Sequence, residues 1–222
     1  MKPTPAPSDA KAPASQPRPT IVRRGPGAGA LVLFAIVAGA ALAADLVTKD
    51  LAFREFLATP GLSQQVQSIL KESDRPLTPP QVLRHLDIHR PLGAGLRMTM
   101  SVNPGVVFGW DLPRWLVLLA TGATVAIVAL MLLGAPRRGV GQIAAIGLIF
   151  AGALGNLYDR LFSCVQLPGV EPIRYHVRDF IDATQLHYPY VFNIADVWLV
   201  AGVGYLLLHT LMPRRGPKPV TR

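Results

Sequence analysis

The stretch Val140–Arg160, VGQIAAIGLIFAGALGNLYDR, decides the fold. Its first nineteen residues, as far as Tyr158, carry no charge. An α-helix needs about 20 apolar residues to cross the hydrocarbon core of a bilayer. The run then ends at the charged pair Asp159-Arg160. This stretch predicts a membrane-spanning helix with ionisable groups at its end.

Three other apolar runs have a similar length. They are Gly27–Ala44, Trp115–Ala135, and a run from about Asn193 to Met212 in which Asp196 is the only charge. The whole chain has a mean hydropathy of +0.35, and only 16% of its residues are charged, fewer than is usual for a soluble domain. We therefore predict an α-helical integral membrane protein with four transmembrane helices.

The predicted spans divide the 222 residues into three parts. Residues 1–26, rich in Pro, Ala and Ser, are expected to form a disordered cytoplasmic tail. Residues 27–213 form the membrane domain, and residues 214–222 form a basic cytoplasmic tail. Ala41-Leu42-Ala43 also resembles a signal-peptide cleavage site. We favour a retained helix, because the run is long for a signal peptide and the polar segment that follows it has the character of a functional site.

The net charge of +9 has two interpretations. Nucleic-acid binding is one, but the Lys and Arg residues cluster at the ends of the apolar runs, which is typical of membrane topology. The clusters are Arg23-Arg24, Arg137-Arg138, and Arg214, Arg215 and Lys218. With four spans, all three lie on one side. We therefore expect both termini in the cytoplasm, segments 49–114 and 159–192 outside, and no nucleic-acid partner.

The two outer segments contain their own structural signals. Ser63–Lys71 and Thr78–His89 have the pattern of short helices, the second with a capping Thr78. Arg97–Val102 and Tyr175–Ile181 alternate between apolar and polar residues. These two segments predict a small antiparallel β-sheet on the outer surface.

Two carboxylates lie at a similar predicted depth. Asp159 lies nineteen residues beyond Val140, which is roughly 29 Å along a helix. Asp196 lies seventeen residues before Pro213, or roughly 26 Å from the opposite helix end. Ionisable residues in membrane helices are functional candidates by default. If the last two helices are antiparallel neighbours, Asp159 and Asp196 can face each other near the outer interface.

Both aspartates follow an asparagine by three residues, in Asn156-Leu157-Tyr158-Asp159 and Asn193-Ile194-Ala195-Asp196. This spacing places each Asn on the same helical face as its Asp. Two close carboxylates tend to share one proton. The ionised partner can then take a proton from water while the protonated one polarises a peptide carbonyl. The alternative is that each Asp only caps a helix or pairs with Arg160 or Arg178.

Other candidate residues are weaker. His85 and His89 have metal-ligand spacing on a predicted helix, but no third ligand is evident nearby, and we predict no metal site. Cys164 is the only cysteine and is expected to be a passive thiol. Asp45 and Lys49 are four residues apart and form either a salt bridge or a contact to substrate.

Five blocks resemble the lipoprotein signal peptidase (signal peptidase II) family of bacteria. The family patterns are D-x-x-T-K, N-x-G-x-x-F-G, G-A-x-G-N-x-x-D-R, V-x-D-F-I and F-N-x-A-D. In the same order, the matching segments are Asp45–Lys49, Asn103–Gly109, Gly152–Arg160, Val177–Ile181 and Phe192–Asp196. The third block is the most specific, and together the blocks extend over most of the chain.

The resemblance implies a membrane aspartic endopeptidase without metal or cofactor. Its catalytic residues would be Asp159 and Asp196. The supporting and substrate-binding residues would be Asn156, Asn193, Asp45, Lys49, Asn103, Gly105, Arg160, Asp179 and Ala195. Such enzymes have four transmembrane helices and a small outer β-sheet. They cut signal peptides from prolipoproteins before a diacylglyceryl-modified cysteine, at the outer face of the cytoplasmic (inner) membrane. The expected partners are lipid-modified prolipoproteins and membrane lipids, with the enzyme acting as a monomer.

Two other functions would also place carboxylates in membrane helices. A small ion- or proton-coupled transporter would need charge nearer mid-bilayer, and a non-catalytic assembly protein would use the aspartates as caps. Residues 60–92 look like an insertion relative to the family and contain none of the five blocks. We therefore expect them to be an extracytoplasmic insertion that is dispensable for the chemistry.

Overall fold

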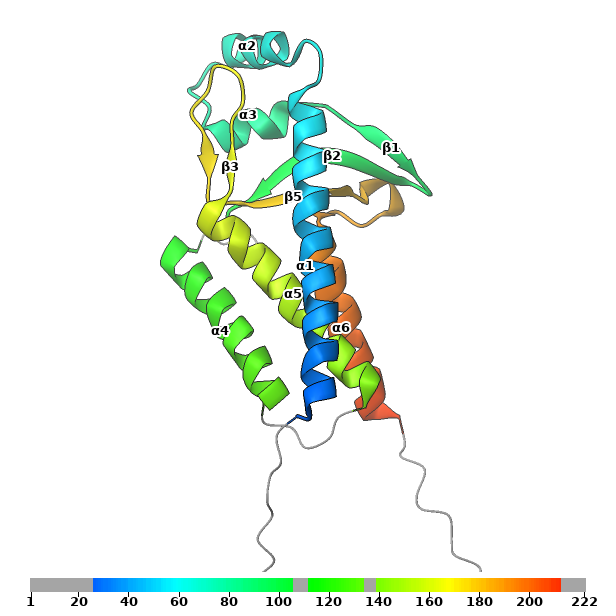
Figure 1. The fold of residues 1–222 in the computed structure, drawn as a ribbon. Coiled ribbons are helices and arrows are strands. Elements are labelled where there is room, and N and C mark those ends of the chain that lie inside the picture. Colours follow the sequence, from blue (N-terminus) through cyan, green and yellow to red (C-terminus); the bar gives the residue numbers. More distant parts are fainter. Residues whose placement is uncertain (1–25, 106–111, 134–138, 213–222) are drawn as a thin grey trace, which may run out of the picture.

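The computed structural model describes residues 26–105, 112–133 and 139–212 (Figure 1). The described helices are α1 (Ala28–Leu57), α2 (Leu62–Glu72), α3 (Pro79–His85), α4 (Arg114–Leu133), α5 (Val140–Phe162) and α6 (Ile194–Leu211), with a short 3-10 turn at Thr184–Leu186. The described strands are β1 (Arg90–Gly93), β2 (Leu96–Asn103), β3 (Cys164–Val165), β4 (Ile173–Arg174), β5 (Val177–Asp182) and β6 (Val191–Phe192).

Within the described residues, four helices are long and apolar enough to cross a membrane: α1, α4, α5 and α6. They lie side by side and alternate in direction along the chain (Figure 1). Helix α5 is central, since it packs against each of the other three. The sheet and the helices α2 and α3 lie beyond one end of this bundle, so the molecule has a membrane part and an outer part. The predicted four-helix membrane fold with a small antiparallel sheet is confirmed.

Helix α1 is longer than the sequence predicts. We expected the span to end near Ala44 and the segment Asp45–Lys49 to close it, but the helix continues to Leu57. Thirty residues make a helix of about 45 Å, which exceeds a hydrocarbon thickness of about 30 Å. The continuation is favoured because Ala52, Phe53 and Phe56 lie on one face and are buried. The last turns of α1 therefore anchor the outer part.

The predicted sheet is present and has four strands in the order β1-β2-β5-β6, all antiparallel. At its centre, β2 pairs with β5, so that Ser101 lies opposite Asp179 and Asn103 lies opposite Val177. The edge strands β1 and β6 and the separate pair β3-β4 are too short to show alternation in the sequence. The pairing places Asp179 in a central strand, at the end of the helix bundle.

The predicted loop helices are found with one change. Helix α2 matches the expected segment, and α3 begins after a capping box between Thr78 and Gln81. However, α3 ends at His85, whereas we expected it to reach His89. Leu86 takes an extended conformation and is buried in the outer core, and the chain then enters β1.

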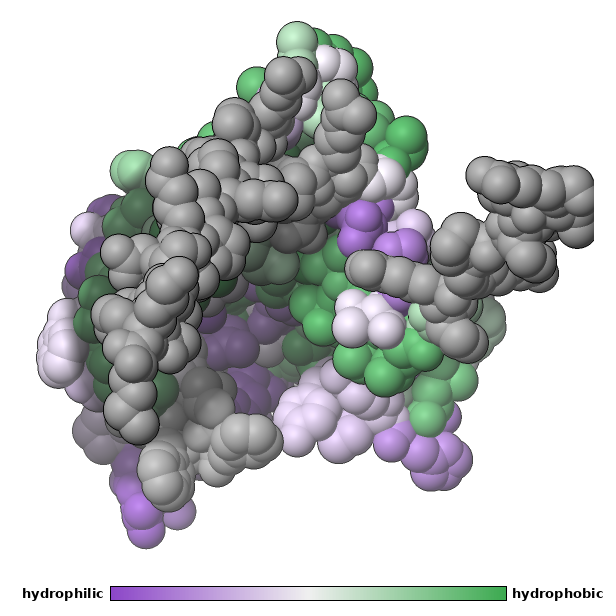
Figure 2. Space-filling view, turned by 90° about the horizontal axis from the view of Figure 1, so that it is seen from below, coloured by the Kyte–Doolittle hydropathy of each residue, from purple (hydrophilic) through white to green (hydrophobic). Residues whose placement is uncertain are grey.

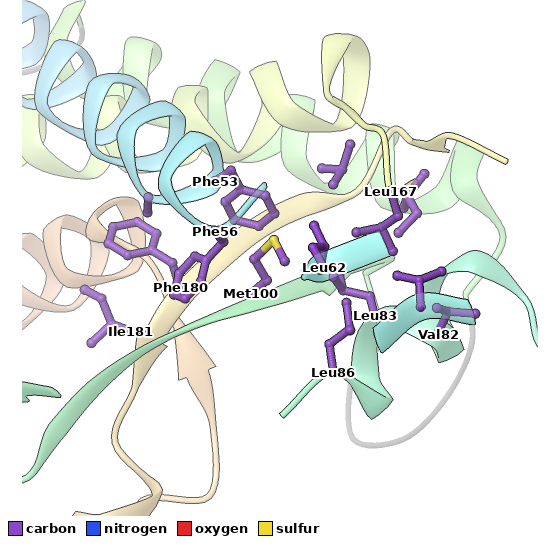
Figure 3. Close-up of a cluster of buried hydrophobic side chains, with 14 residues drawn as sticks. Phe53, Phe56, Leu62, Val82, Leu83, Leu86, Met100, Leu167, Phe180 and Ile181 are labelled. Carbon is purple, nitrogen blue, oxygen red and sulfur yellow. The ribbon is translucent and has the colours of Figure 1, made fainter. Parts of the chain in front are cut away.

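The outer part has a larger apolar core than its short strands suggest (Figure 3). Phe53 and Phe56 of α1 pack there with Met100 of β2 and with Phe180 and Ile181 of β5. The segment 60–92 contributes five buried side chains to this core: Leu62, Val66, Val82, Leu83 and Leu86. A smaller cluster, with Ile146 and Ile149 at its centre, lies among the membrane helices. The segment 60–92 is thus built into the support of the sheet and is not peripheral.

Several sequence-based expectations lie outside the described residues. These are the N-terminal tail up to residue 25, residues 106–109 of the second family block, and the basic clusters at 23–24, 137–138 and 214–218.

Candidate active site

Helix α5 approaches its neighbours closely because of two glycines. A Cβ atom at Gly152 would collide with the carbonyl oxygen of Ala195 on α6. A Cβ atom at Gly155 would collide with the carboxylate of Asp45 on α1. Small residues let membrane helices approach closely, and these two glycines do so here. The close approach brings polar groups of α1, α5 and α6 to one level.

Lys49 is the centre of a buried ionic cluster. Its Nζ lies 2.8 Å from Oδ2 of Asp45, 3.0 Å from Oδ1 of Asn156 and 3.2 Å from Oδ2 of Asp159. The contacts to Asp45 and Asn156 are hydrogen bonds, and the contact to Asp159 is an ion pair. The Lys49, Asp45 and Asp159 side chains have no exposed surface. Asp45 also accepts a hydrogen bond of 2.8 Å from the N–H of Ala195.

Asp159 has a second cationic partner. Nε and Nη2 of Arg178, on β5, donate to its Oδ1 at 3.0 and 2.8 Å. The backbone N–H of Arg178 donates to its Oδ2 at 3.0 Å. The ion pair with Arg178 that we considered as an alternative is therefore present. Two carboxylates, Asp45 and Asp159, face two cations, Lys49 and Arg178, so the cluster is formally neutral.

Asp196 lies at the start of α6 in a capping box. Its backbone N–H donates to Oδ1 of Asn193 at 3.1 Å, and its Oδ2 accepts from the N–H of Asn193 at 3.2 Å. Nδ2 of Asn156 donates to its Oδ1 at 2.9 Å. The capping role that we considered is thus also present. Asp196 differs from Asp159 in being only partly buried and in having amide partners and no cation within hydrogen-bond distance in the described structure.

Asp179 belongs to the same site, on the central strand β5. Its Oδ1 accepts a hydrogen bond of 2.6 Å from Nδ2 of Asn193, whose backbone N–H binds Asp196. One asparagine therefore holds both carboxylates. Burial, followed by the nearby Asp196 carboxylate, raises the pKa of Asp179 to about 7. Two carboxylates that share a site without a saturating cation can share one proton.

The contacts favour Asp179 over Asp159 as the partner of Asp196. The sequence singled out Asp159 and Asp196 because of their repeated N-x-x-D pattern, and that pair remains a prediction. In the structure, however, Asp159 is bound by two cations and is connected to Asp196 only through Asn156 and Lys49. The sequence treated Asp179 as a supporting residue because the depth of a strand residue cannot be measured along a helix. Its one signal was an acidic residue on the strand face that also carries Val177 and Ile181, where alternation predicts an apolar side chain.

Arg160 is the remaining cation of the site. It interacts electrostatically with Asp179, Asp196 and Asp159, in decreasing order. Its Nη1 donates to the backbone oxygen of Asn156, and its Nε is buried without a hydrogen-bond partner among the described residues. It lines a groove of about 240 Å³ with Asn156 and with Thr121 and Thr124 of α4. Viewed along the helices, the molecule is hollowed near its middle, with hydrophilic residues lying deep inside (Figure 2).

The other predicted site residues lie at the rim or in the packing. Asn103 ends β2, and its Oδ1 accepts a hydrogen bond of 2.8 Å from the N–H of Gly105. Gly105 has a φ of 103° and lies against Val117 of α4, where a side chain would collide. Ala195 is fully buried against α5 and α1. These three residues shape the edge of the site.

The two histidines are not brought together. His85 contacts the backbone oxygen of Gln81, whereas His89 lies between Asp87 and Asp182. Among the described residues, no group of three potential metal ligands is found. Cys164 is exposed at the start of β3.

Comparison with known proteins identifies relatives. A family model described as Signal peptidase (SPase) II matches residues 37–212. The chain is 31% identical to a lipoprotein signal peptidase of Leifsonia xyli over 94% of this chain and 80% of that one. It is 36% identical to one of Caulobacter vibrioides over 55% of this chain and 68% of the other. A solved bacterial membrane enzyme has the same fold, with a TM-score of 0.54 and 20% identity over 86% of this chain and 94% of that one.

Proposed function

The chain belongs to the signal peptidase II family, and we propose that it removes the signal peptide from lipid-modified prolipoproteins, cutting before the lipidated cysteine. Its family and its four apolar helices make it a multi-pass protein of the bacterial inner membrane. The observation that best supports a peptidase site is that Asn193 binds two carboxylates, Asp179 and Asp196. All residues of the proposed site come from one chain.

In the proposed mechanism, Asp196 and Asp179 act as an aspartic pair. Asp196 is the more exposed of the two, and it takes a proton from the attacking water. Asp179 is buried and carries the shared proton, which it donates toward the oxygen of the scissile carbonyl. With Asp179 protonated, the charge of Asp196 is balanced by Arg160. Asp196 then gives its proton to the leaving nitrogen as the C–N bond breaks, and Asp179 takes back the proton from the new carboxyl group, so no covalent enzyme intermediate is needed.

The role proposed for Asp159 is to position this pair. By holding Lys49, it orients Asn156, and Asn156 in turn holds Asp196. By holding Arg178, it fixes the strand position next to Asp179. This division of roles departs from the sequence-based pair, in which Asp159 itself was catalytic.

Arg160 and its groove fit the lipid-modified part of the substrate. The groove lies between α4 and α5 in the membrane layer, where an acyl chain can enter sideways. The unpartnered Nε of Arg160 can donate to an ester or peptide carbonyl oxygen. We propose that the diacylglyceryl group occupies this groove during cleavage.

The proposed orientation rests on the basic clusters of the sequence, which all fall on one side of the four spans. With both termini in the cytoplasm, the site faces the outer side of the membrane, where exported substrates arrive. Cys164 tests this, because it is exposed and is the only cysteine. A membrane-impermeant maleimide should label it in intact spheroplasts. Cysteines placed at Arg138 or Lys218 in a Cys164→Ser background should react only after lysis, and labelling of either in intact cells would overturn the orientation.

The deciding experiment is cleavage of a diacylglyceryl-modified model prolipoprotein by the purified protein in detergent. Release of the signal peptide, lost in Asp196→Asn, is the expected outcome. A transporter or an assembly protein would release no product. Substrate without the lipid serves as the specificity control and should not be cut.

A further inference from the structure

A second hollow opens on the opposite side of α5 from the groove of Arg160. It has a volume of about 430 Å³ and lies between α1, α5 and the start of the β-strands. Its wall is polar and apolar in nearly equal parts. Leu46 and Val47 of α1 and Tyr158 and Phe162 of α5 form the apolar side, and the polar side includes Asp50, Ser163 and Arg178. Val47, Tyr158 and Phe162 are exposed, and the Tyr158 and Phe162 rings lie 5.1 Å apart. No residue of the proposed reaction other than Arg178 lines it.

Arg178 contributes the cationic group of this hollow. Its Nε and Nη2 are bound to Asp159, but no hydrogen bond within the described residues uses its Nη1. The side chain keeps 14% of its surface exposed, so the guanidinium has one side on the ionic cluster and one side toward the hollow. Among the described residues that line it, the only acidic one is Asp50, which is paired with Arg54 at 2.9 Å. The hollow therefore offers a donor that is not opposed by a free carboxylate.

Depth and chemistry together identify the ligand class. Val47 is about 29 Å from the start of α1, which is near the outer boundary of the hydrocarbon layer. Guanidinium groups bind phosphate oxygens well, and aromatic residues such as Tyr158 are typical of the interfacial layer. An apolar wall below a guanidinium at this level matches an acyl chain below a phosphate.

We propose that this hollow binds an anionic phospholipid of the outer leaflet, with its phosphate on Nη1 of Arg178 and an acyl chain along Val47 and Phe162. Arg178 occupies the position that the V-x-D-F-I pattern leaves unspecified, so the pattern itself does not require a guanidinium there. The lipid contacts the same guanidinium that holds Asp159, which links bilayer composition to the ionic cluster. The proposal concerns binding and does not depend on the proposed peptidase activity.

Cys164 lines the same hollow and reports its occupancy. The measurement is the rate at which N-ethylmaleimide alkylates Cys164 in the full-length protein in detergent, with and without short-chain phosphatidylglycerol below its micellar concentration. The lipid should slow alkylation in a saturable way. A diacylglycerol of equal chain length should protect much less. Equal protection by inorganic phosphate would assign the site to a free anion and overturn the lipid.

Two pairs of variants locate the site. Arg178→Gln should require about tenfold more lipid for half protection, because a charge-assisted hydrogen bond is lost, while Arg84→Gln, at an exposed position on α3, should behave as the wild type. Val47→Trp should fill the hollow, so that Cys164 is alkylated at the same rate with and without lipid. Leu51→Trp, one turn further along α1, should leave the ratio of these two rates as in the wild type. If Arg178→Gln does not fold, the Val47→Trp pair decides. An unchanged ratio in Val47→Trp would refute the site.

Discussion

Asp159 and Asp179 are buried to nearly the same extent, at 0% and 4% exposure, yet their surroundings are opposite. Asp159 is held by two cations, Lys49 and Arg178. Asp179 has an amide partner and a second carboxylate nearby. A buried carboxylate between cations is stabilised as an ion, whereas one beside another carboxylate is suited to hold a proton. The partners of a buried acid, more than its burial, therefore indicate its role.

The largest expected effect comes from removing the proposed pair. Asp196→Asn and Asp179→Asn should each lower the cleavage rate by about a thousandfold or more, because an amide keeps the shape but cannot transfer the proton. The measurement is the initial rate on the lipid-modified substrate. Asp182→Asn, on the same strand β5 but bound to Arg97, is the matched control and should retain most activity. Substantial activity in Asp179→Asn would return the catalytic role to Asp159.

Breaking the ionic cluster should primarily affect stability. Asp159→Asn leaves Arg178 and Lys49 with a neutral partner, and breaking a buried ion pair costs about 3–5 kcal/mol. A lower melting temperature in detergent, with a reduced but measurable cleavage rate, is the expected result. If Asp159→Asn melted like the wild type and were inactive, Asp159 would be a catalytic residue, and the positioning role proposed for it would be wrong.

Removing a buried side chain from the outer core should disturb the position of Asp179 more than that of Asp159. Leu83→Ala should cost about 2–5 kcal/mol, because Leu83 packs in the core that also contains Phe180 and Ile181 beside Asp179. Ile146→Ala, fully buried among the membrane helices, is the matched control. At a temperature where both variants remain folded, Leu83→Ala should lose more cleavage activity. Equal losses would show that the outer core does not position the site.

The smallest expected effect is a pH dependence. The pKa of Asp179, raised to about 7, implies that kcat/KM falls about tenfold per pH unit above that value, as the shared proton is lost. Because the folded state binds this proton more tightly than the unfolded state, the group's contribution to stability declines between about pH 4 and pH 7. Asp179→Asn should therefore melt no lower than the wild type at pH 8. A flat profile of kcat/KM between pH 6 and 9 would contradict a protonated Asp179.

The membrane part of the fold could be predicted from the sequence because a span needs only length and an absence of charge. The end of α1 could not be predicted this way, since Asp45 and Lys49 interrupt the apolar run while the helix continues. A helical spacing of apolar residues at Ala52, Phe53 and Phe56 was the available signal. The short strands β1 and β6 form only through pairing with distant segments, so local pattern could not reveal them.

The sequence predicted which residues belong to the site more completely than which of them contact each other. Asp45, Lys49, Asn156, Asn193 and Asp196 were all singled out and lie together. Which carboxylate faces which partner depends on where β5 lies against α5, and spacing along the chain does not contain that information. For the same reason, the segment 60–92 was expected to be dispensable. Its amphipathic helices contribute Val66 and Leu83 to the core under the sheet, so we now expect its deletion to destabilise the outer part.

The pairing of Asp45 with Lys49 one turn later in α1 also concerns how the protein is made. A helix that enters the bilayer with two separate charges pays a large desolvation penalty for each. Because the two groups are four residues apart, α1 brings its own counterion and can be inserted as a neutral segment before α5 and α6 have been synthesised. The later helices then meet a preassembled pair, and Asn156 and Asp159 complete the coordination of Lys49. The ionic cluster can thus be assembled stepwise, in the order in which the helices leave the ribosome.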